Sequence, residues 1–350
     1  MSTSLEGAFR QVDAANPVVA VVGATGAVGV ELLRCMEARR FPVGGLKLLA
    51  SPRSAGKTLA FNGRQYAVEA LGEDSFQGVD IALFSAGSGI SKKFAPLAVA
   101  AGAIVVDNSS AFRMNPDVPL VVPEVNAAAL AGHSGIVANP NCVAAIACMA
   151  LAPLQRAHPI RRVNAATYQA ASGAGAAAME ELRASTAAYL AGESFTPTVL
   201  PHPYAFNLFS HNAEVDPETG YNGEELKVVA ESRRILDRPE LPFSITCIRV
   251  PVLRAHGISM TVEFDEKVSP EEARALFAAA PGVRLVDDRE KNHFPMPSEA
   301  SGQDDVLVGR IRTDLGDPSG RTLSIFVVGD QLLKGAALNA VQIAELLLAR

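Results

Sequence analysis

The first 140 residues alternate between short apolar runs and longer stretches of helix-forming residues. Short apolar runs that end in glycine, serine or asparagine are typical of strands buried in a parallel sheet. The runs expected to be strands are Val18 to Val22, Leu46 to Ala50, Val79 to Ser85 and Ala103 to Asp107. This part of the chain is therefore predicted to be an α/β domain.

The pattern changes after Arg161, where Val163 to Gln169 alternates apolar and polar residues as a half-buried strand does. Further strands are expected within Phe243 to Phe264 and in an antiparallel pair, Val306 to Leu315 with Thr322 to Val328. Helices are expected from the segment Ala171 to Gly175, which opens a helix, through about Leu190, from Gly223 to Leu236, after the capping residue Ser269, and from Lys334 to Ala349. The second half is thus predicted to be α+β with an antiparallel or mixed sheet.

A length of 350 residues is enough for two ordinary domains. We expect the first to span 1–141 and to be completed by the C-terminal helix 333–350, and the second to span 142–332. The net charge of −6 argues against a general nucleic-acid binder, and no apolar run reaches the length of a membrane span. Met1 to Pro17 is polar, lacks the apolar core of a signal peptide, and is expected to be a loose lead-in.

The glycine-rich segment Gly23-Ala24-Thr25-Gly26-Ala27-Val28-Gly29 follows the first predicted strand and opens a helix. Glycines at such a turn let the backbone approach a pyrophosphate, which the helix N-terminus then holds. The spacing is G-x-x-G-x-x-G rather than G-x-G-x-x-G, so an ordinary strand-to-helix turn is the alternative. The position at the first strand favours a dinucleotide, with contacts at Gly23, Thr25, Gly26, Ala27 and Val28.

The second predicted strand ends in Ser51-Pro52-Arg53-Ser54-Ala55-Gly56-Lys57. A fold that binds NAD usually places a carboxylate here for the ribose 2′-hydroxyl, and this segment has none. Serines and cations suit a 2′-phosphate, so Ser51, Arg53 and Ser54 predict NADP; the alternative is a solvated basic loop. Ser85, Ala86 and Gly87 end the next strand, where ligands bind in open α/β sheets.

Cys142 is the candidate nucleophile because Asn139-Pro140-Asn141-Cys142 joins an apolar run to a predicted helix. Asn141 is a good N-cap, and a thiol on the first helical turn faces amides that favour a thiolate. A helix terminus gives an anion only about 0.3–1 kcal/mol, less than one pKa unit, so a second group such as a histidine is needed. From the turn alone, a small buried cysteine is an equal alternative.

The four cysteines have neither zinc-ligand nor disulfide spacing: Cys35, Cys142, Cys148 and Cys247. We therefore expect no metal and a reducing cytoplasm. Among the six histidines we favour His256, although its spacing does not separate it from His202 or His211. A strict period of two would put Arg249 and His256 on opposite faces of a strand, but Pro251 argues against a regular strand between them. Their convergence is left open.

Three further charged residues have an ordinary and a functional interpretation. Glu224 and Lys227 share a helix face, which is usually a surface ion pair but can also grip a zwitterionic amino acid or an anion. Arg113 follows Asn108-Ser109-Ser110 close to a predicted ligand-binding edge. An arginine in a loop is usually a surface charge, and here it could hold a phosphate bidentately.

Together these motifs resemble those of the aspartate-semialdehyde dehydrogenase family, over Val18 to Leu348. The segments that carry the resemblance are Gly23 to Gly29, Asp107 to Arg113, Val122 to Asn126, Asn139 to Cys142, Tyr168 to Gly173, Glu224 to Lys227, Arg249 to His256, Lys334 to Ala337 and Asn339 to Gln342. The family implies a Rossmann-type domain followed by an α+β domain with a mixed sheet, the plan of glyceraldehyde-3-phosphate dehydrogenase. One departure is Val143-Ala144, where many relatives have serine or threonine after the cysteine.

The resemblance implies a role for each matching residue. Cys142 is the nucleophile, His256 the acid/base, and Gln169 a residue that orients the substrate or thioester. Arg249 binds the α-carboxylate of the substrate and Glu224 its amine. Phosphate binding falls to Arg113 and Lys227. Asn141 is placed with the substrate-binding residues, and the remaining cofactor contacts are Ser172, Gly173 and Asn339.

The implied reaction converts L-aspartyl-4-phosphate and NADPH to L-aspartate-4-semialdehyde, phosphate and NADP, on the route to threonine, methionine and lysine. Family members are usually homodimers and sometimes tetramers. A rival is N-acetyl-γ-glutamyl-phosphate reductase, whose acylated amine would not need Glu224. A second rival is a catalytically silent paralogue, which should have lost Cys142 or the pair Arg249 and His256; all are present.

Overall fold

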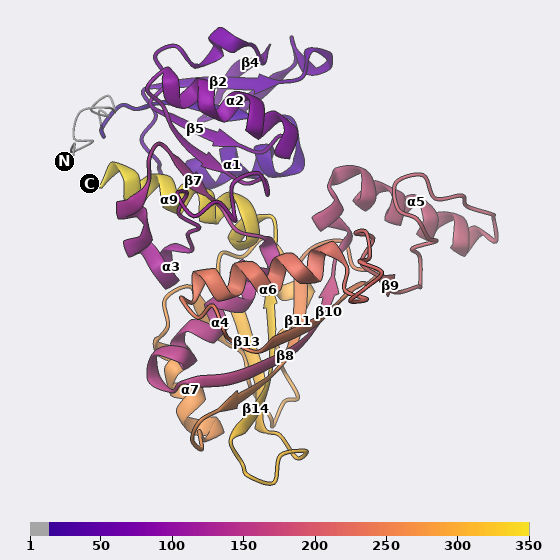
Figure 1. The fold of residues 1–350 in the computed structure, drawn as a ribbon. Coiled ribbons are helices and arrows are strands. Elements are labelled where there is room, and N and C mark those ends of the chain that lie inside the picture. The colour runs from indigo at the N-terminus through magenta and orange to yellow at the C-terminus, as the bar shows by residue number, and fades with distance from the viewer. Residues whose placement is uncertain (1–13, 350) are drawn as a thin grey trace. The chain divides into compact units, whose positions relative to one another are not determined.

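The computed structural model describes residues 14–349, and its contacts divide them into two compact units. The first unit contains residues up to Pro140 together with those from Ala336 onward, and the second is Asn141–Gly335 (Figure 1). Most of the predicted lead-in, Met1 to Pro17, lies outside the described residues. Among those described, no helix is both long and apolar enough to cross a membrane.

The first unit is built on a sheet in the order β3-β4-β2-β1-β5-β6-β7, parallel except for β3. Its strands are β1 Val18–Val22, β2 Gly45–Ala50, β3 Thr58–Phe61, β4 Arg64–Ala70, β5 Ile81–Phe84, β6 Ile104–Asp107 and β7 Ile136–Ala138. Its helices are α1 Ala27–Ala38, α2 Ser88–Ala100, α3 Pro123–Asn126 and α9 Leu338–Leu348, with short 3₁₀ turns η1 Pro52–Ser54, η2 Glu73–Phe76 and η3 Ala127–Gly132. The strand order reverses beside β1, where doubly wound sheets bind ligands.

The second unit has a mixed sheet in the order β12-β13-β14-β11-β8-β10-β9. Its strands are β8 Ile160–Gln169, β9 Phe209–Ser210, β10 Phe243–Arg249, β11 His256–Phe264, β12 Val283–Leu285, β13 Val306–Thr313 and β14 Thr322–Gly329. Its helices are α4 Cys142–Ala157, η4 Ala171–Ala174, α5 Ala176–Ala191, α6 Gly223–Ile235, α7 Pro270–Ala279 and α8 Pro297–Ala300. Helices α4, α6 and α7 pack on one face of this sheet (Figure 1). The predicted fold class is confirmed for both halves.

The C-terminal helix was predicted to run from Lys334 to Ala349, and the predicted first residue is wrong. A π-helical turn, η5 Leu333–Ala337, precedes α9, which begins at Leu338. A Cβ atom at Gly335 would lie 2.7 Å from Cβ of Cys142, so this turn passes close to the start of α4. Single π-turns often occur at functional sites, and here one brings bare backbone against a candidate nucleophile.

Two glycines of the predicted cofactor turn are required by close backbone approach. Gly23 has a φ of +84°, and a Cβ there would lie 2.5 Å from the carbonyl oxygen of Ser85. A Cβ at Gly29, in the first turn of α1, would lie 2.3 Å from the carbonyl oxygen of Gly23. Glycine at these positions therefore lets β1, the turn, α1 and the end of β5 pack together.

Gly29→Ala should lower the free energy of unfolding by about 1–3 kcal/mol, because the methyl group has no space. Gly89→Ala is the matched control: Gly89 also lies in the first turn of a helix, but its added Cβ would have no atom within 4 Å. That variant should gain up to about 1 kcal/mol from helix propensity. Urea unfolding of the three proteins measures both changes, and equal effects would contradict the packing argument.

Candidate active site

Three predicted site residues lie at one end of neighbouring strands in the second unit. Arg249 ends β10, Gln169 ends β8 opposite it, and His256 begins β11, which pairs antiparallel with β8. Their exposed fractions are 3%, 1% and 0%. The strand pairing thus places a cation, an amide and an imidazole side by side at the buried ends of three inner strands.

Arg249 and His256 converge, which the sequence left open. Strand β10 ends at Arg249, and an irregular segment containing Pro251 separates it from β11, so the period of two does not carry across. A Cβ atom at Gly173 would lie 3.0 Å from His256 Nε2 and 3.1 Å from Arg249 Nη1. The small residue at 173 therefore lets the ring and the guanidinium approach the same point.

The His256 ring is held as a neutral hydrogen-bond donor. Its Nδ1 atom accepts from the backbone N–H of Ala170 at 3.0 Å, so the neutral ring carries its proton on Nε2. That Nε2 atom is buried and has no hydrogen-bond partner within residues 14–349. Burial, and then the charge of Arg249, hold the pKa of His256 well below its usual value.

Asn141 caps the helix that begins with Cys142, as predicted. Its Oδ1 atom accepts from the backbone N–H groups of Val143 at 2.8 Å and Ala144 at 3.2 Å. Two of the amides expected to favour a thiolate are therefore occupied by the cap, which weakens that part of the sequence argument. Because the cap uses only their backbone amides, the Val143-Ala144 departure leaves it intact.

Two carboxylates of α6 accept hydrogen bonds from Asn141. The backbone N–H of Asn141 donates to Glu231 Oε2 at 2.5 Å, and its side-chain amide donates to Glu224 Oε1 at 2.9 Å. Glu231 was not predicted as a site residue from the sequence. The available signal was its spacing: Glu231 follows Glu224 by seven residues, which puts both on one helix face.

Glu224 also accepts from Gln169 Nε2 at 3.3 Å, and Gln169 Oε1 accepts from the Thr167 hydroxyl at 2.9 Å. Both ends of the Gln169 amide are therefore fixed. Lys227 lies one turn further along α6 and is exposed, whereas Glu224 is buried. The two residues lie three positions apart on α6, and only Glu224 is turned into the protein.

Cys142 differs from the other cysteines in its accessibility. It is half-buried, whereas Cys35, Cys148 and Cys247 are buried. Burial raises the pKa of Cys148 to about 12 and also raises the pKa of Cys247. Among the described residues, no cluster of three or more histidine, cysteine or acidic side chains could hold a metal ion.

In the first unit, a pocket of about 340 Å³ lies where the strand order reverses. The predicted residues that line it are Gly23, Thr25, Gly26, Ser51, Ser85 and Ala86. Helix α1 begins at Ala27 after Gly26 without a side-chain cap, in contrast to α4. An uncapped helix start beside this pocket can receive a phosphate group.

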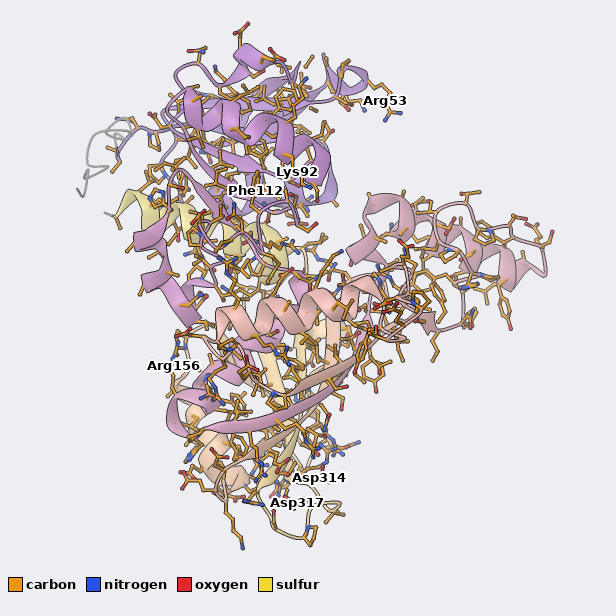
Figure 2. The ribbon with its side chains drawn as sticks, in the orientation of Figure 1. Arg53, Lys92, Phe112, Arg156, Asp314 and Asp317 are labelled. Carbon is orange, nitrogen blue, oxygen red and sulfur yellow. The ribbon has the colours of Figure 1, made fainter. Side chains whose placement is uncertain are left out.

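The other predicted cofactor residues lie around this pocket or outside it. Thr25 Oγ1 donates to Ser54 Oγ at 3.3 Å, which ties η1 to the glycine turn. Arg53 extends from η1 into solvent at the margin of the unit (Figure 2). Gly87 caps α2 with a φ of +86°. Val28, like Ala27, belongs to α1 and is not among the residues that line the pocket.

Asn339 and Arg113 are both buried in the first unit. The side-chain amide of Asn339 donates to Asn139 Oδ1 at 2.6 Å and to the Val121 carbonyl at 2.9 Å, and its Oδ1 has no partner within residues 14–349. Arg113 is 9% exposed and donates to the carbonyls of Asn139 and Asn108 at 2.9 and 2.7 Å. Arg113 is thus a positioned cation rather than the surface charge that loops usually carry.

Ser172 is buried, and its hydroxyl accepts from Gln331 Nε2. Gln331 Oε1 also accepts from the backbone N–H of Ala255, which has a φ of +72° immediately before His256. Ser172 therefore helps to hold a strained backbone beside the imidazole. The cofactor contacts predicted at Ser172 and Gly173 stay predictions.

Brief treatment with iodoacetamide should modify Cys142 before any other cysteine, because only Cys142 is half-buried. Peptide mass spectrometry of the folded protein measures this directly. Cys35, Cys148 and Cys247 are internal controls and should react only after unfolding. A Cys142 that reacts no faster than these three would show that it is an inert structural thiol.

Two family models match the chain: "Semialdehyde dehydrogenase, NAD binding domain" at residues 18–133 and "Semialdehyde dehydrogenase, dimerisation domain" at residues 151–334. Aspartate-semialdehyde dehydrogenase of Synechocystis sp. is 52% identical over 332 residues, covering 95% of this chain and 97% of the relative. That of Aquifex aeolicus is 49% identical, with 94% and 97% covered. The crystal structure of aspartate semialdehyde dehydrogenase II of Vibrio cholerae complexed with ASA has a TM-score of 0.92 and 42% identity, with 95% and 98% covered. The chain belongs to the aspartate-semialdehyde dehydrogenase family.

Proposed function

We propose that this chain reduces L-aspartyl-4-phosphate to L-aspartate-4-semialdehyde with NADPH, through a thioester on Cys142. The proposal rests on a continuous series of contacts from the start of α4 to the ends of strands β8 and β10. Asn141, beside Cys142, contacts Glu224, which contacts Gln169. Gln169 pairs with Arg249, and Gly173 brings Arg249 to His256. The proposed nucleophile, the acceptor for the substrate amine, the donor to the substrate carboxylate and the donor to the oxyanion therefore all belong to the second unit.

In the proposed mechanism, the Cys142 thiolate attacks the acyl phosphate, phosphate leaves, and a thioester forms. Arg249 would hold the α-carboxylate and Glu224 the amine, while Gln169 keeps the acyl group in place. Bound NADPH supplies the hydride that reduces the thioester carbon. Collapse of the tetrahedral thiohemiacetal then releases the aldehyde and the thiol.

His256 fits this scheme as the donor to the developing oxyanion, through the unpartnered proton on Nε2. A role as acid/base requires the ring to take up and release a proton. Protonation at Nδ1 would set it against the Ala170 N–H that now donates there. The acid/base role of His256 remains a prediction, and it needs Ala170 to move.

The preference for NADP is supported by the loop after β2. Residues 51–57 contain no carboxylate, and Arg53 is exposed beside the pocket residues Ser51 and Pro52. Asn339 Oδ1, which has no hydrogen-bond partner among the described residues, is an acceptor that suits the carboxamide of a nicotinamide ring. Arg113 and Lys227 are proposed to bind the phosphate that is released.

A homodimer is also proposed, supported by the match to a dimerisation domain. Tyr168 and Phe326 pack edge to face at 6.1 Å, and Tyr168 is 42% exposed. A partly exposed aromatic pair on a sheet suits a second protomer. A cytoplasmic location and a role in threonine, methionine and lysine synthesis belong to the same proposal.

The protein should reduce NADP in the presence of aspartate semialdehyde and phosphate. N-acetylglutamate semialdehyde should be a poor substrate, because its amine is blocked. Cys142→Ala should abolish turnover, since no thioester can form, while Cys35→Ala serves as the matched control with normal activity. Absorbance at the NADPH band measures all four reactions. Substantial turnover by Cys142→Ala would rule out covalent catalysis.

Arg53→Ala should raise KM for NADP by about ten- to a hundredfold, because one charge-assisted contact to the 2′-phosphate is lost. KM for NAD should stay within twofold. Arg64→Ala removes another exposed cation of the same unit and should change neither value. Initial rates at varied cofactor concentration measure the difference. Equal KM values for the two cofactors in the wild-type protein would contradict the assignment of this loop.

A further inference from the structure

His211, which follows the edge strand β9, lies beside Arg249, the proposed carboxylate-binding residue. Strand β9 pairs antiparallel with β10, with Phe209 opposite Arg249, and the His211 backbone N–H donates to the Cys247 carbonyl at 2.9 Å. His211 is therefore opposite Cys247 and diagonal to Arg249 on the same face of the sheet. Its Nε2 atom lies 2.8 Å from Arg249 Nη2.

The His211 ring faces more hydrogen-bond donors than it can accept from. Its Nδ1 atom faces the backbone N–H of Ala213 at 3.2 Å, and its Nε2 atom faces the guanidinium, which only donates. A neutral imidazole has one acceptor nitrogen and a protonated one has none. Both contacts therefore cannot be satisfied together. If Ala213 fixes the tautomer, an N–H of His211 points at an N–H of Arg249.

Two donors that point at each other form a site for an anion. The other two nitrogens of Arg249 each donate one hydrogen bond, Nε to Asn212 Oδ1 and Nη1 to the Ala170 carbonyl, both at 3.2 Å. Only the Nη2 side, toward His211, faces a group that cannot fully accept. Lys227 adds positive potential at the same ring, and Glu224 adds the acceptor that an ammonium group would need.

We propose that His211 binds the substrate, with its Nε2–H and Arg249 Nη2 sharing the α-carboxylate. The inference rests on the proposed function and adds a specificity residue to it. The carboxylate replaces the direct contact between ring and guanidinium, and each oxygen then accepts from one of them. With Glu224 taking the ammonium group, the site recognises a free α-amino acid rather than any small aldehyde.

The ring is well suited to this role because it stays neutral. Burial, and then the charge of Arg249, lower the pKa of His211 to about 4. A neutral ring on the Nε2–H tautomer contributes one directed donor at neutral pH and adds no charge beside Arg249. His202, earlier on the same loop, is exposed and packs on Phe209, so it can take no such part.

The test compares aspartate semialdehyde with 3-aminopropanal, which has the same aldehyde and amine but no carboxylate. His211→Phe should lower kcat/KM for aspartate semialdehyde by about ten- to a hundredfold, mainly through KM, because one hydrogen bond to a charged group is lost. The slow turnover of 3-aminopropanal should be unchanged. His211→Gln, which keeps an N–H near the position of Nε2, should recover part of the loss, and His202→Phe should behave as wild type.

Equal losses with both aldehydes would show that His211 supports the structure of the site in general and does not act on the carboxylate, and no loss would exclude it from the site; either result overturns the proposal. Calorimetric titration with L-2-aminobutyrate, which has the ammonium and carboxylate groups but no aldehyde, separates this from the reaction itself. Weaker binding to His211→Phe than to the wild-type chain supports the site even if aspartate semialdehyde is not turned over. Unchanged binding refutes it.

Discussion

The geometry around Cys142 depends on two carboxylates that helix α6 buries beside Asn141. Glu231 is 1% exposed and accepts from the Asn141 backbone, and Glu224 is 8% exposed and accepts from its side chain. Leaving a buried polar group without its partner costs about 1–3 kcal/mol, and more for a charged one. The start of α4 is therefore held by contacts that are costly to break, and the position of Cys142, the proposed nucleophile, follows from them.

The contacts around Cys142 fix the position of its thiol more than they favour the thiolate. Negative charge near a thiol opposes its ionisation, and the cap on α4 already uses the amides of Val143 and Ala144. Both imidazoles near Arg249 are neutral, so they add no positive charge to that of Arg249 and the exposed Lys227. In the proposed reaction the substrate adds a phosphate and a carboxylate to this site, and Lys227 and Arg249 are the cations proposed to bind them.

Local sequence signals identified the elements of this fold, and tertiary pairing decided what they bring together. The cap at Asn141 and the strand ending at Arg249 were both predictable, because each is a local pattern. The β3–β4 hairpin had a signal that went unused, Asn62-Gly63 with positive φ at both residues. The approach of Arg249 to His256 and the place of His211 depend on strand register and an irregular loop, and no local pattern encodes them.

The backbone at Gly335 has a consequence for the entropy of the reaction. Its bare Cα occupies one side of the Cys142 side chain so closely that an added methyl group would be 2.7 Å from Cβ. The Gly335 backbone therefore excludes the rotamers of Cys142 in which the sulfur would point toward it. The freedom of the sulfur is then lost once, as the chain folds, rather than at every turnover, and a larger share of thiol–substrate encounters begins in a reactive orientation.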